Sequence, residues 1–259
     1  MKNIPNLFTL LNLFFGCIAV IFTLQTGLAV LSTPEGAQYL DMPEKMGVAS
    51  LFIGAAALVD FLDGLVARMF KATSPMGKQL DSLADVVSFG VAPGMILYQF
   101  LRISFARQAD GFDISPVWFL PALLIPCAAA FRLAKFNVDE SQTFGFKGVP
   151  TPAAGLVVAS IPLIYWYTQS ETVTALLLNK WVLYGIIVML AWLMVSNLPL
   201  MALKFTDYTV KTNLPKLILL ALAIVSAVFL KWLAVPVVFI FYIIVSLVSE
   251  KRSKTKNFI

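Results

Sequence analysis

The 259-residue chain contains no histidine, and only 13% of its residues are charged. Histidine is the usual general base and the usual zinc ligand, so acid–base or metal chemistry in this protein must use carboxylates. The two cysteines, Cys17 and Cys127, lie in apolar runs without the close spacing of a zinc knuckle. We therefore expect both to be small, buried hydrophobic side chains.

Long apolar runs make up most of the sequence. Hydrophobic residues account for 59% of the chain and the mean hydropathy is +0.86, whereas about a quarter of the residues of a soluble domain are charged. Several runs are long enough to cross a hydrocarbon core of about 30 Å. The composition predicts an all-α polytopic membrane protein. Because the first run exceeds the length of a signal-peptide core, we expect it to be an uncleaved span.

Hydropathy predicts eight transmembrane helices, separated by segments rich in turn-forming residues. Their expected ranges are 7–31, 47–70, 79–104, 116–136, 151–168, 178–200, 213–230 and 234–250. With the amino terminus in the cytoplasm, 14 of the 19 lysine and arginine residues fall on the cytoplasmic side. The far side keeps Lys45, Arg102, Arg107, Lys180 and Lys231.

This asymmetry predicts an orientation in the cytoplasmic (inner) membrane. By the positive-inside rule, both termini and the segment between the second and third spans face the cytoplasm. The net charge of +5 then favours anionic lipid headgroups, not nucleic acid, as the partner.

Four aspartates, Asp60, Asp63, Asp81 and Asp85, interrupt the apolar pattern near that segment. The first two are three residues apart and the last two are four apart, so each pair shares one face of a helix. The connection between the two helices is short, which predicts antiparallel packing with the acidic faces together.

Four carboxylates in one pocket repel each other unless cations neutralise them. A site of oxygen ligands suits hard divalent cations such as Mg²⁺ or Mn²⁺. Two such ions held by shared carboxylates are a recurrent device for phosphoryl transfer, and a carboxylate at the rim can accept a proton from an attacking hydroxyl.

Other residues of the same stretch fit a phosphate-containing ligand. Gly64 and Gly77 let a bulky ligand approach the backbone, and Ala67 leaves room one turn beyond Asp63. Arg68 and Lys78 flank the expected pocket as cationic phosphate partners.

Two other interpretations of the aspartates are open at this point. They can be ordinary charges at the ends of loops, although pairs at helical spacing on adjacent helices disfavour this. They can also form an ion or proton site of a transporter. A transporter needs acids or broken helices along a path to the far face, and the far-side acids lie in predicted loops.

One spaced motif contains all four aspartates. It reads Asp60-x-x-Asp63-Gly64-x-x-Ala67-Arg68 and, after eight residues, Gly77-x-x-x-Asp81-x-x-x-Asp85. This motif resembles the signature of the CDP-alcohol phosphotransferases. The resemblance implies transfer of a substituted phosphate from a CDP-linked donor to an alcohol, with release of CMP. It also implies a homodimer whose six-helix catalytic core spans residues 1–200, with two further helices in residues 201–259.

The resemblance also implies roles for the motif residues. Asp60, Asp63 and Asp81 would bind metal, Asp81 and Asp85 would reach a second ion, and Asp85 would be the catalytic base. Gly64, Ala67, Arg68 and Gly77 would line the CDP and diphosphate site.

Further segments are similar to bacterial membrane-embedded phosphatidylserine synthases: "GKQLDSLADVVSFGVAPG", "FRLAKFNVD", "FKGVPTPAAG" and "NIPNLFTLLNLFFG". This similarity implies CDP-diacylglycerol as donor and L-serine as acceptor, and it places Asn6 and Thr9 near the nucleotide. An acceptor such as glycerol 3-phosphate or an inositol phosphate stays open.

A serine acceptor brings a carboxylate and an ammonium group. Arg132 and Lys135 lie three apart at the cytoplasmic end of the fourth span, so they project from one face, and Asn137 follows closely. We expect these three residues to bind serine. Alternatively, Arg132 and Lys135 anchor the helix by extending their charges to the lipid headgroups.

Overall fold

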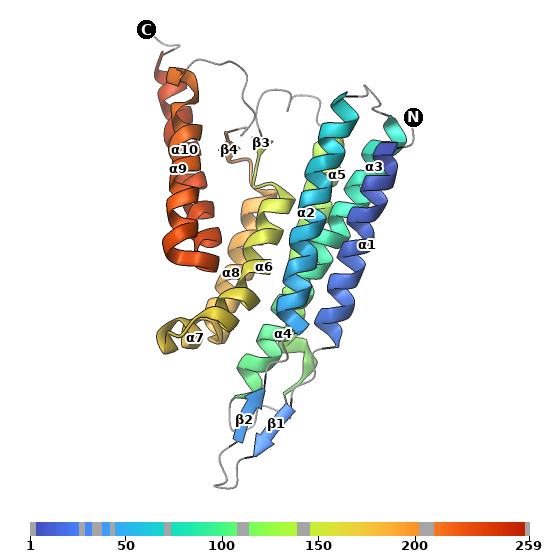
Figure 1. The fold of residues 1–259 in the computed structure, drawn as a ribbon, viewed down its shortest axis with the longest axis vertical. Helices are drawn as coiled ribbons and strands as arrows, with labels where there is room; N and C mark the ends of the chain where they lie inside the picture. Colours follow the sequence, from blue (N-terminus) through green and yellow to red (C-terminus); the bar gives the residue numbers. More distant parts are fainter. Residues whose placement is uncertain are drawn as a thin grey trace.

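The computed structural model describes residues 4–25, 29–32, 38–41, 45–69, 74–107, 114–138, 146–201 and 210–256. Its α-helices are α1 (Ile4–Leu24), α2 (Lys45–Met69), α3 (Pro75–Asp85), α4 (Ala92–Ala106), α5 (Leu124–Val138), α6 (Thr151–Tyr167), α7 (Glu171–Leu177), α8 (Lys180–Val195), α9 (Val210–Leu230) and α10 (Ala234–Lys256). A π-helical segment, η1 (Val86–Val91), and two 3₁₀ segments, η2 (Pro116–Leu123) and η3 (Lys231–Leu233), connect some of them. Most helices run along the long axis of a bundle, and α1 begins at the same end of the bundle where α10 ends (Figure 1).

The all-α membrane fold is confirmed. Within the described ranges, five helical stretches are long and apolar enough to cross a membrane, or six if the bent pair α7 and α8 forms one span. The stretch Asn213–Ser249 counts once in this tally, but its two halves, α9 and α10, pack side by side as a helical hairpin (Figure 1). The chain is therefore a multi-pass membrane protein.

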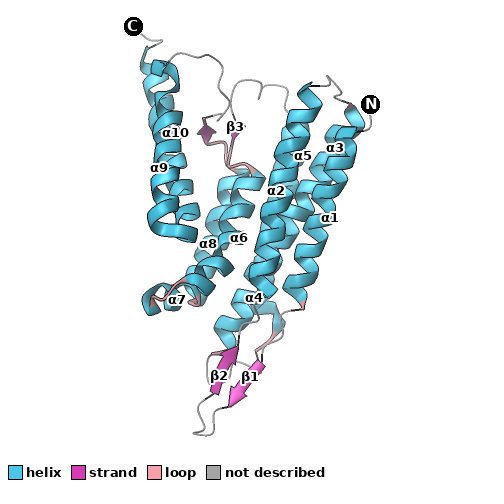
Figure 2. Ribbon diagram, in the orientation of Figure 1, coloured by secondary structure: helices cyan, strands magenta, loops and turns pink. Residues whose placement is uncertain are grey.

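Two short antiparallel strand pairs lie at opposite ends of the bundle (Figure 2). Strands β1 (Ala29–Ser32) and β2 (Gln38–Asp41) form one pair, and β3 (Phe146–Lys147) and β4 (Pro199–Leu200) form the other. The predicted first span, 7–31, was too long, because α1 ends at Leu24 and the apolar residues that follow form β1. A short apolar run alone does not distinguish a helix from a strand.

Two further sequence predictions are corrected. The predicted span 178–200 ends earlier in the structure, because α8 stops at Val195 and Pro199 begins β4. The short helix α7, which precedes α8 and is bent by 62° from it, was not predicted. Cys17 and Cys127 are exposed on the bundle surface, not buried. In a bilayer the outer surface of a helix bundle faces apolar lipid tails, so an apolar side chain is as stable there as in the interior.

Helices α3, η1 and α4 form one continuous rod, Pro75–Ala106, which is the most buried of the candidate spans. Small residues on its neighbours permit this close packing. A Cβ on Gly155 of α6 would lie 2.9 Å from the Cβ of Phe89, and a Cβ on Gly16 of α1 would clash with Ser88. Contacts of this kind are typical of membrane helices, which associate by close approach at small residues. They place the end of α3 at the centre of the bundle.

Helices α9 and α10 form a C-terminal hairpin. The turn lies at Lys231, whose φ of 50° is in the left-handed region. Helix α10 packs against α6 and β4. The division into a catalytic core, 1–200, and an added unit, 201–259, stays a prediction.

Candidate metal centre and substrate pocket

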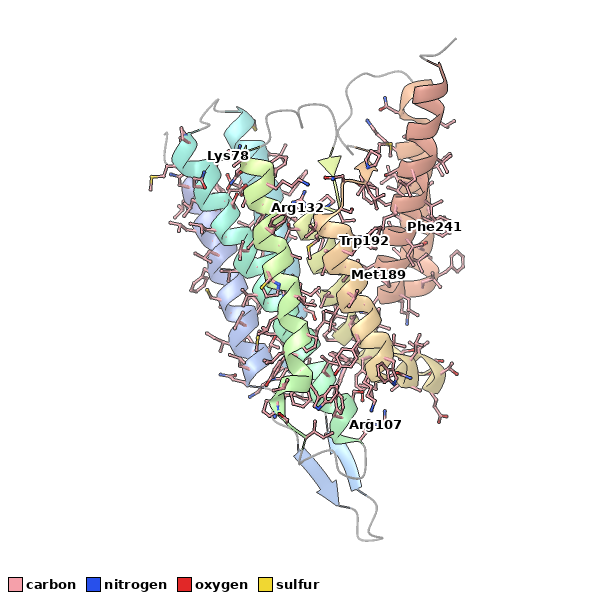
Figure 3. The ribbon with its side chains drawn as sticks, turned by 180° about the vertical axis from the view of Figure 1, so that it is seen from behind. Lys78, Arg107, Arg132, Met189, Trp192 and Phe241 are labelled. Carbon is pink, nitrogen blue, oxygen red and sulfur yellow. The ribbon has the colours of Figure 1, made fainter. Side chains whose placement is uncertain are left out.

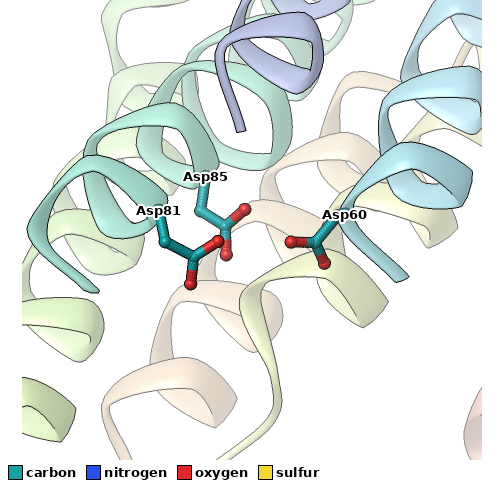
Figure 4. A group of neighbouring side chains, drawn as sticks. All are labelled: Asp60, Asp81 and Asp85. Atoms are coloured by element: carbon teal, nitrogen blue, oxygen red, sulfur yellow. The ribbon is translucent and has the colours of Figure 1, made fainter. Parts of the chain in front are cut away.

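The start of α3 is fixed by its own sequence. Ser74 is the N-cap residue, its Oγ accepts a hydrogen bond from the backbone N of Gly77 at 3.0 Å, and Pro75 occupies the first helical position. This combination is a strong helix-start signal. With the helix beginning at Pro75, Asp81 and Asp85 lie one turn apart on α3. Both side chains point toward Asp60 of α2 (Figure 4).

Three of the four aspartates form a compact cluster. Asp60 of α2 faces Asp81 and Asp85 of α3, and their carboxylates point toward one another (Figure 4). One oxygen from each lies within 4.8 Å of the other two. Divalent cations bind carboxylate oxygens at about 2.0–2.6 Å, so small side-chain rotations suffice for one ion to contact all three. The donor set, which is oxygen only and acidic, suits Mg²⁺ or Mn²⁺.

The fourth aspartate, Asp63, lies beside this cluster. It is 7% exposed and accepts a hydrogen bond from the hydroxyl of Thr9 of α1. It is also close enough to Asp60 and Asp81 for their charges to repel. Helix α1 therefore helps to position the acidic site, and Thr9 contacts a carboxylate directly.

The aspartates line a pocket of about 800 Å³, a volume typical of small-ligand sites. The pocket brings together eleven of the predicted site residues: Asn6, Thr9, Asp60, Asp63, Gly64, Gly77, Lys78, Asp81, Asp85, Arg132 and Asn137. Lys135 is not among its lining residues, and the side chains of Ala67 and Arg68 lie outside the described part of the structure.

Helices α3 and α5 are tied together at the rim of the pocket. The ammonium group of Lys78 donates to the backbone carbonyl of Asn137 at 3.1 Å, and the side-chain amide of Asn137 donates to Ser82 Oγ at 2.8 Å. A phosphate ligand of Lys78 would have to share its ammonium group with this carbonyl. Ser82 was missed from the sequence because a serine beside a motif aspartate has no distinctive pattern.

Arg132 is a buried cation in the wall of this pocket. It is 7% exposed, and its Nη1 donates to Thr151 Oγ1 at 3.1 Å. Its Nε has no hydrogen-bond partner among the described residues. Burial argues against the headgroup-anchor interpretation for this residue. A guanidinium group in a pocket wall, with a donor that has no partner among the described residues, is chemically able to bind a carboxylate or phosphate.

Lys135 lies one turn further along α5 and has a different environment. Its Nζ donates to Asn197 Oδ1 at 2.6 Å, which ties α5 to the segment between α8 and β4. Figure 3 shows Lys78 and Arg132 toward one end of the bundle, with Arg107 near the other.

Comparison with known proteins gives a family match that covers the residues of this site. The family model for CDP-alcohol phosphatidyltransferases matches residues 2–203, which include all four aspartates. The chain belongs to this family. Its members are metal-dependent transferases, which agrees with the cluster of Asp60, Asp81 and Asp85 and removes the ion-transporter alternative.

Several relatives of the chain have named activities. A CDP-diacylglycerol–serine O-phosphatidyltransferase of Helicobacter pylori J99 is 33% identical over 233 residues, 88% of this chain and 81% of the relative. The Bacillus subtilis 168 protein of the same name is 37% identical over 117 residues, 45% of this chain and 61% of the relative. An archaetidylserine synthase of Methanothermobacter thermautotrophicus is 28% identical over 168 residues, 64% of this chain and 60% of the relative.

One polar contact of this family member was not predicted from the sequence. Asn12 of α1 is fully buried, and its Nδ2 donates to Asp85 Oδ1 at 3.2 Å. Its backbone carbonyl accepts a hydrogen bond from Ser88 Oγ at 3.0 Å. A usable signal was present, because Asn12 lies one turn after Thr9 in an apolar span, and polar residues there usually face the bundle interior.

Proposed function

We propose that this CDP-alcohol phosphatidyltransferase transfers the phosphatidyl group of CDP-diacylglycerol to the hydroxyl of L-serine, giving phosphatidylserine and CMP. The convergence of Asp60, Asp81 and Asp85 beside the buried Arg132 in one pocket is the observation that supports this most. The names of two relatives, from Helicobacter pylori and Bacillus subtilis, support serine as the acceptor.

In this proposal Asp60, Asp63, Asp81 and Asp85 hold two divalent cations, Mg²⁺ or Mn²⁺. Such cations, when bound there, would neutralise charge on a diphosphate and on a departing phosphate group. Asn6, Thr9, Gly64, Gly77 and Lys78 surround the donor, because all five line the same pocket as the aspartates. Ala67 and Arg68 belong to the proposed donor site by their place in the motif.

Asp85 is the proposed catalytic base. As the serine oxygen bonds to the lipid-side phosphorus, Asp85 accepts the hydroxyl proton, and the bond from that phosphorus to the CMP oxygen breaks. Asn12 holds the carboxylate of Asp85 from the side of α1. Asp85 is 6% exposed, and together with this hydrogen bond its burial limits the orientations of the carboxylate, which favours a productive geometry for proton transfer.

Arg132 is the proposed ligand of the serine carboxylate, and Asn137 lies at the same rim of the pocket. Lys135 does not line the described pocket; in the proposal it supports α5 beside the serine site through its hydrogen bond to Asn197. Acceptors that contain a phosphate would need more positive charge near the site. Among the described residues that line the pocket, only Lys78 and Arg132 are cationic, which favours serine over glycerol 3-phosphate or an inositol phosphate.

An acceptor assay tests the proposed function. Purified protein in detergent micelles is given CDP-diacylglycerol with Mg²⁺ or Mn²⁺ and one of serine, glycerol 3-phosphate or inositol phosphate, and CMP release and lipid product are measured. We expect phosphatidylserine to form at least tenfold faster than the other products, an estimate based on the polar contacts that the other acceptors would leave unmatched. Preferential use of another acceptor would contradict the serine assignment but leave the transferase chemistry intact.

We also propose that the pocket end of the bundle faces the cytoplasm in the inner membrane and that the protein is a homodimer. The distribution of cations supports the orientation. The resemblance to the family is the basis for the dimer, which cross-linking in native membranes can test.

Replacing Asn12 with leucine, which has a similar volume, is expected to lower kcat by about tenfold to 100-fold. This is the usual cost of removing a residue that orients a metal-binding or catalytic carboxylate. The KM for CDP-diacylglycerol is expected to stay within about twofold, because Asn12 is not among the described lining residues of the pocket.

The matched control is Thr23→Val. It also removes a buried side-chain hydrogen bond of α1, the one from Thr23 Oγ1 to the carbonyl of Ala19, but this bond does not reach the pocket. Both variants are compared by kcat and by melting temperature in detergent. Equal kcat values for Asn12→Leu and Thr23→Val would show that Asn12 has only a packing role.

A further inference from the structure

The C-terminal hairpin of α9 and α10 lies outside residues 2–203, which the family model matches, yet it contacts the core. Its contact with the core includes a specific polar group. Tyr242 of α10 is 6% exposed, and its hydroxyl donates to the backbone carbonyl of Met201 at 3.1 Å. Met201 directly follows β4, so the hairpin is bonded to the end of this strand.

Strand β4 connects this contact to the substrate pocket. It pairs with β3, with Phe146 opposite Leu200 and Lys147 opposite Pro199. The segment that follows β3 leads through Pro150, which lines the pocket, to Thr151 at the start of α6.

The segment from β3 to α6 is held tightly against the end of α8. The backbone N of Gly148 donates to the carbonyl of Leu198 at 2.8 Å, and that of Val149 to the carbonyl of Leu193 at 3.0 Å. Gly148 has a φ of 77°, and a Cβ there would lie 2.6 Å from the carbonyl oxygen of Met194. Only glycine fits this turn, so the path of the chain into Thr151 is fixed.

Thr151 is the residue that holds Arg132. It is fully buried, and its Oγ1 accepts the hydrogen bond from Arg132 Nη1. A path of hydrogen bonds and short backbone segments therefore runs from Tyr242 through Met201, the β3–β4 pair and Thr151 to the guanidinium group.

We propose that Tyr242 is a positioning residue for the acceptor site, through which the C-terminal hairpin fixes β4, Thr151 and the guanidinium group of Arg132. The inference rests on the proposed function, because it takes Arg132 as the ligand of the acceptor carboxylate. It assigns to the hairpin a role in acceptor affinity, separate from binding of the donor.

The variant Tyr242→Phe tests this, since it removes only the hydroxyl. Its KM for serine is expected to rise by about twofold to tenfold, the range that loss of one hydrogen bond produces, with the KM for CDP-diacylglycerol and kcat within about twofold of wild type. Tyr184→Phe is the matched control: the Tyr184 hydroxyl donates to the carbonyl of Trp118 at 2.7 Å, and neither residue lines the described pocket. A KM for serine equal to that of the control would overturn the inference.

A double-mutant cycle with Thr151→Val distinguishes positioning from a general loss of stability. If Tyr242 acts through Thr151 and Arg132, the two substitutions together raise the KM for serine by less than the product of their separate effects. Multiplicative effects, or a matching change in the KM for CDP-diacylglycerol, would contradict the inference. If the wild-type protein does not use serine at all, the proposed function fails and this inference falls with it.

Discussion

Replacement of Asp85 with asparagine is expected to lower the rate of phosphatidyl transfer by about 10³-fold or more. An amide of nearly the same shape cannot accept the proton of the acceptor hydroxyl, and loss of a general base alone costs about 10²- to 10⁴-fold. Asp85 is also one of the three clustered carboxylates, so the substitution weakens metal binding as well. The rate is measured as CMP release by purified protein at saturating serine and CDP-diacylglycerol.

Glu171→Gln is the matched control, because it makes the same carboxylate-to-amide change in α7, at an exposed position outside the pocket. Its rate is expected to stay within about twofold of wild type, as is usual for a surface substitution. Near-normal transfer by a folded Asp85→Asn protein would reject Asp85 as the base.

Removal of divalent cations is expected to abolish transfer altogether. Without a cation, the carboxylates of Asp60, Asp81 and Asp85 repel one another at their observed spacing, and they also repel the donor diphosphate. Treatment with excess chelator should reduce CMP release below detection, and added Mg²⁺ or Mn²⁺ should restore it. The same addition should raise the melting temperature, because an ion that binds only the folded state stabilises it by about 2.7 kcal/mol at about 100 times its Kd.

A chelator that has been saturated with Mg²⁺ beforehand is the control for effects on the micelle. It should leave both the rate and the melting temperature unchanged. Full activity after exhaustive chelation would contradict a metal-dependent mechanism for this protein.

Much of the acidic site could be predicted from the sequence because its geometry is local. Spacings of three and four residues place each aspartate pair on one helix face, and the short connection from α2 to α3 brings Asp60 against Asp81 and Asp85. The sequence did not show that Asp63 turns toward Thr9, since this depends on where α1 packs. The presence of apolar membrane helices was also predictable, because the hydrocarbon core requires long apolar segments, but the ends of two spans were not.

The acceptor side could be predicted only in part. Arg132 and Lys135 lie three residues apart on α5, and the sequence assigned both to serine. In the structure one is buried in the pocket wall against Thr151, whereas the other bonds Asn197 outside it. The difference arises from partners 19 and 62 residues away in the chain, whose positions no local pattern reveals. Tyr242 was missed for the same reason, because it bonds a residue of a distant element. The polar position of Asn12 in an apolar span was visible in the sequence, but its partner Asp85 was not.

Titration of the purified protein with Mn²⁺, monitored by electron paramagnetic resonance of the free ion, tests the central claim most directly. The account predicts two bound ions per chain for the wild type, and binding weakened by at least about tenfold in the Asp60→Asn, Asp81→Asn double variant, which lacks one carboxylate from each helix. Equal binding by the wild type and the folded double variant would show that the aspartates of α2 and α3 do not form the metal site.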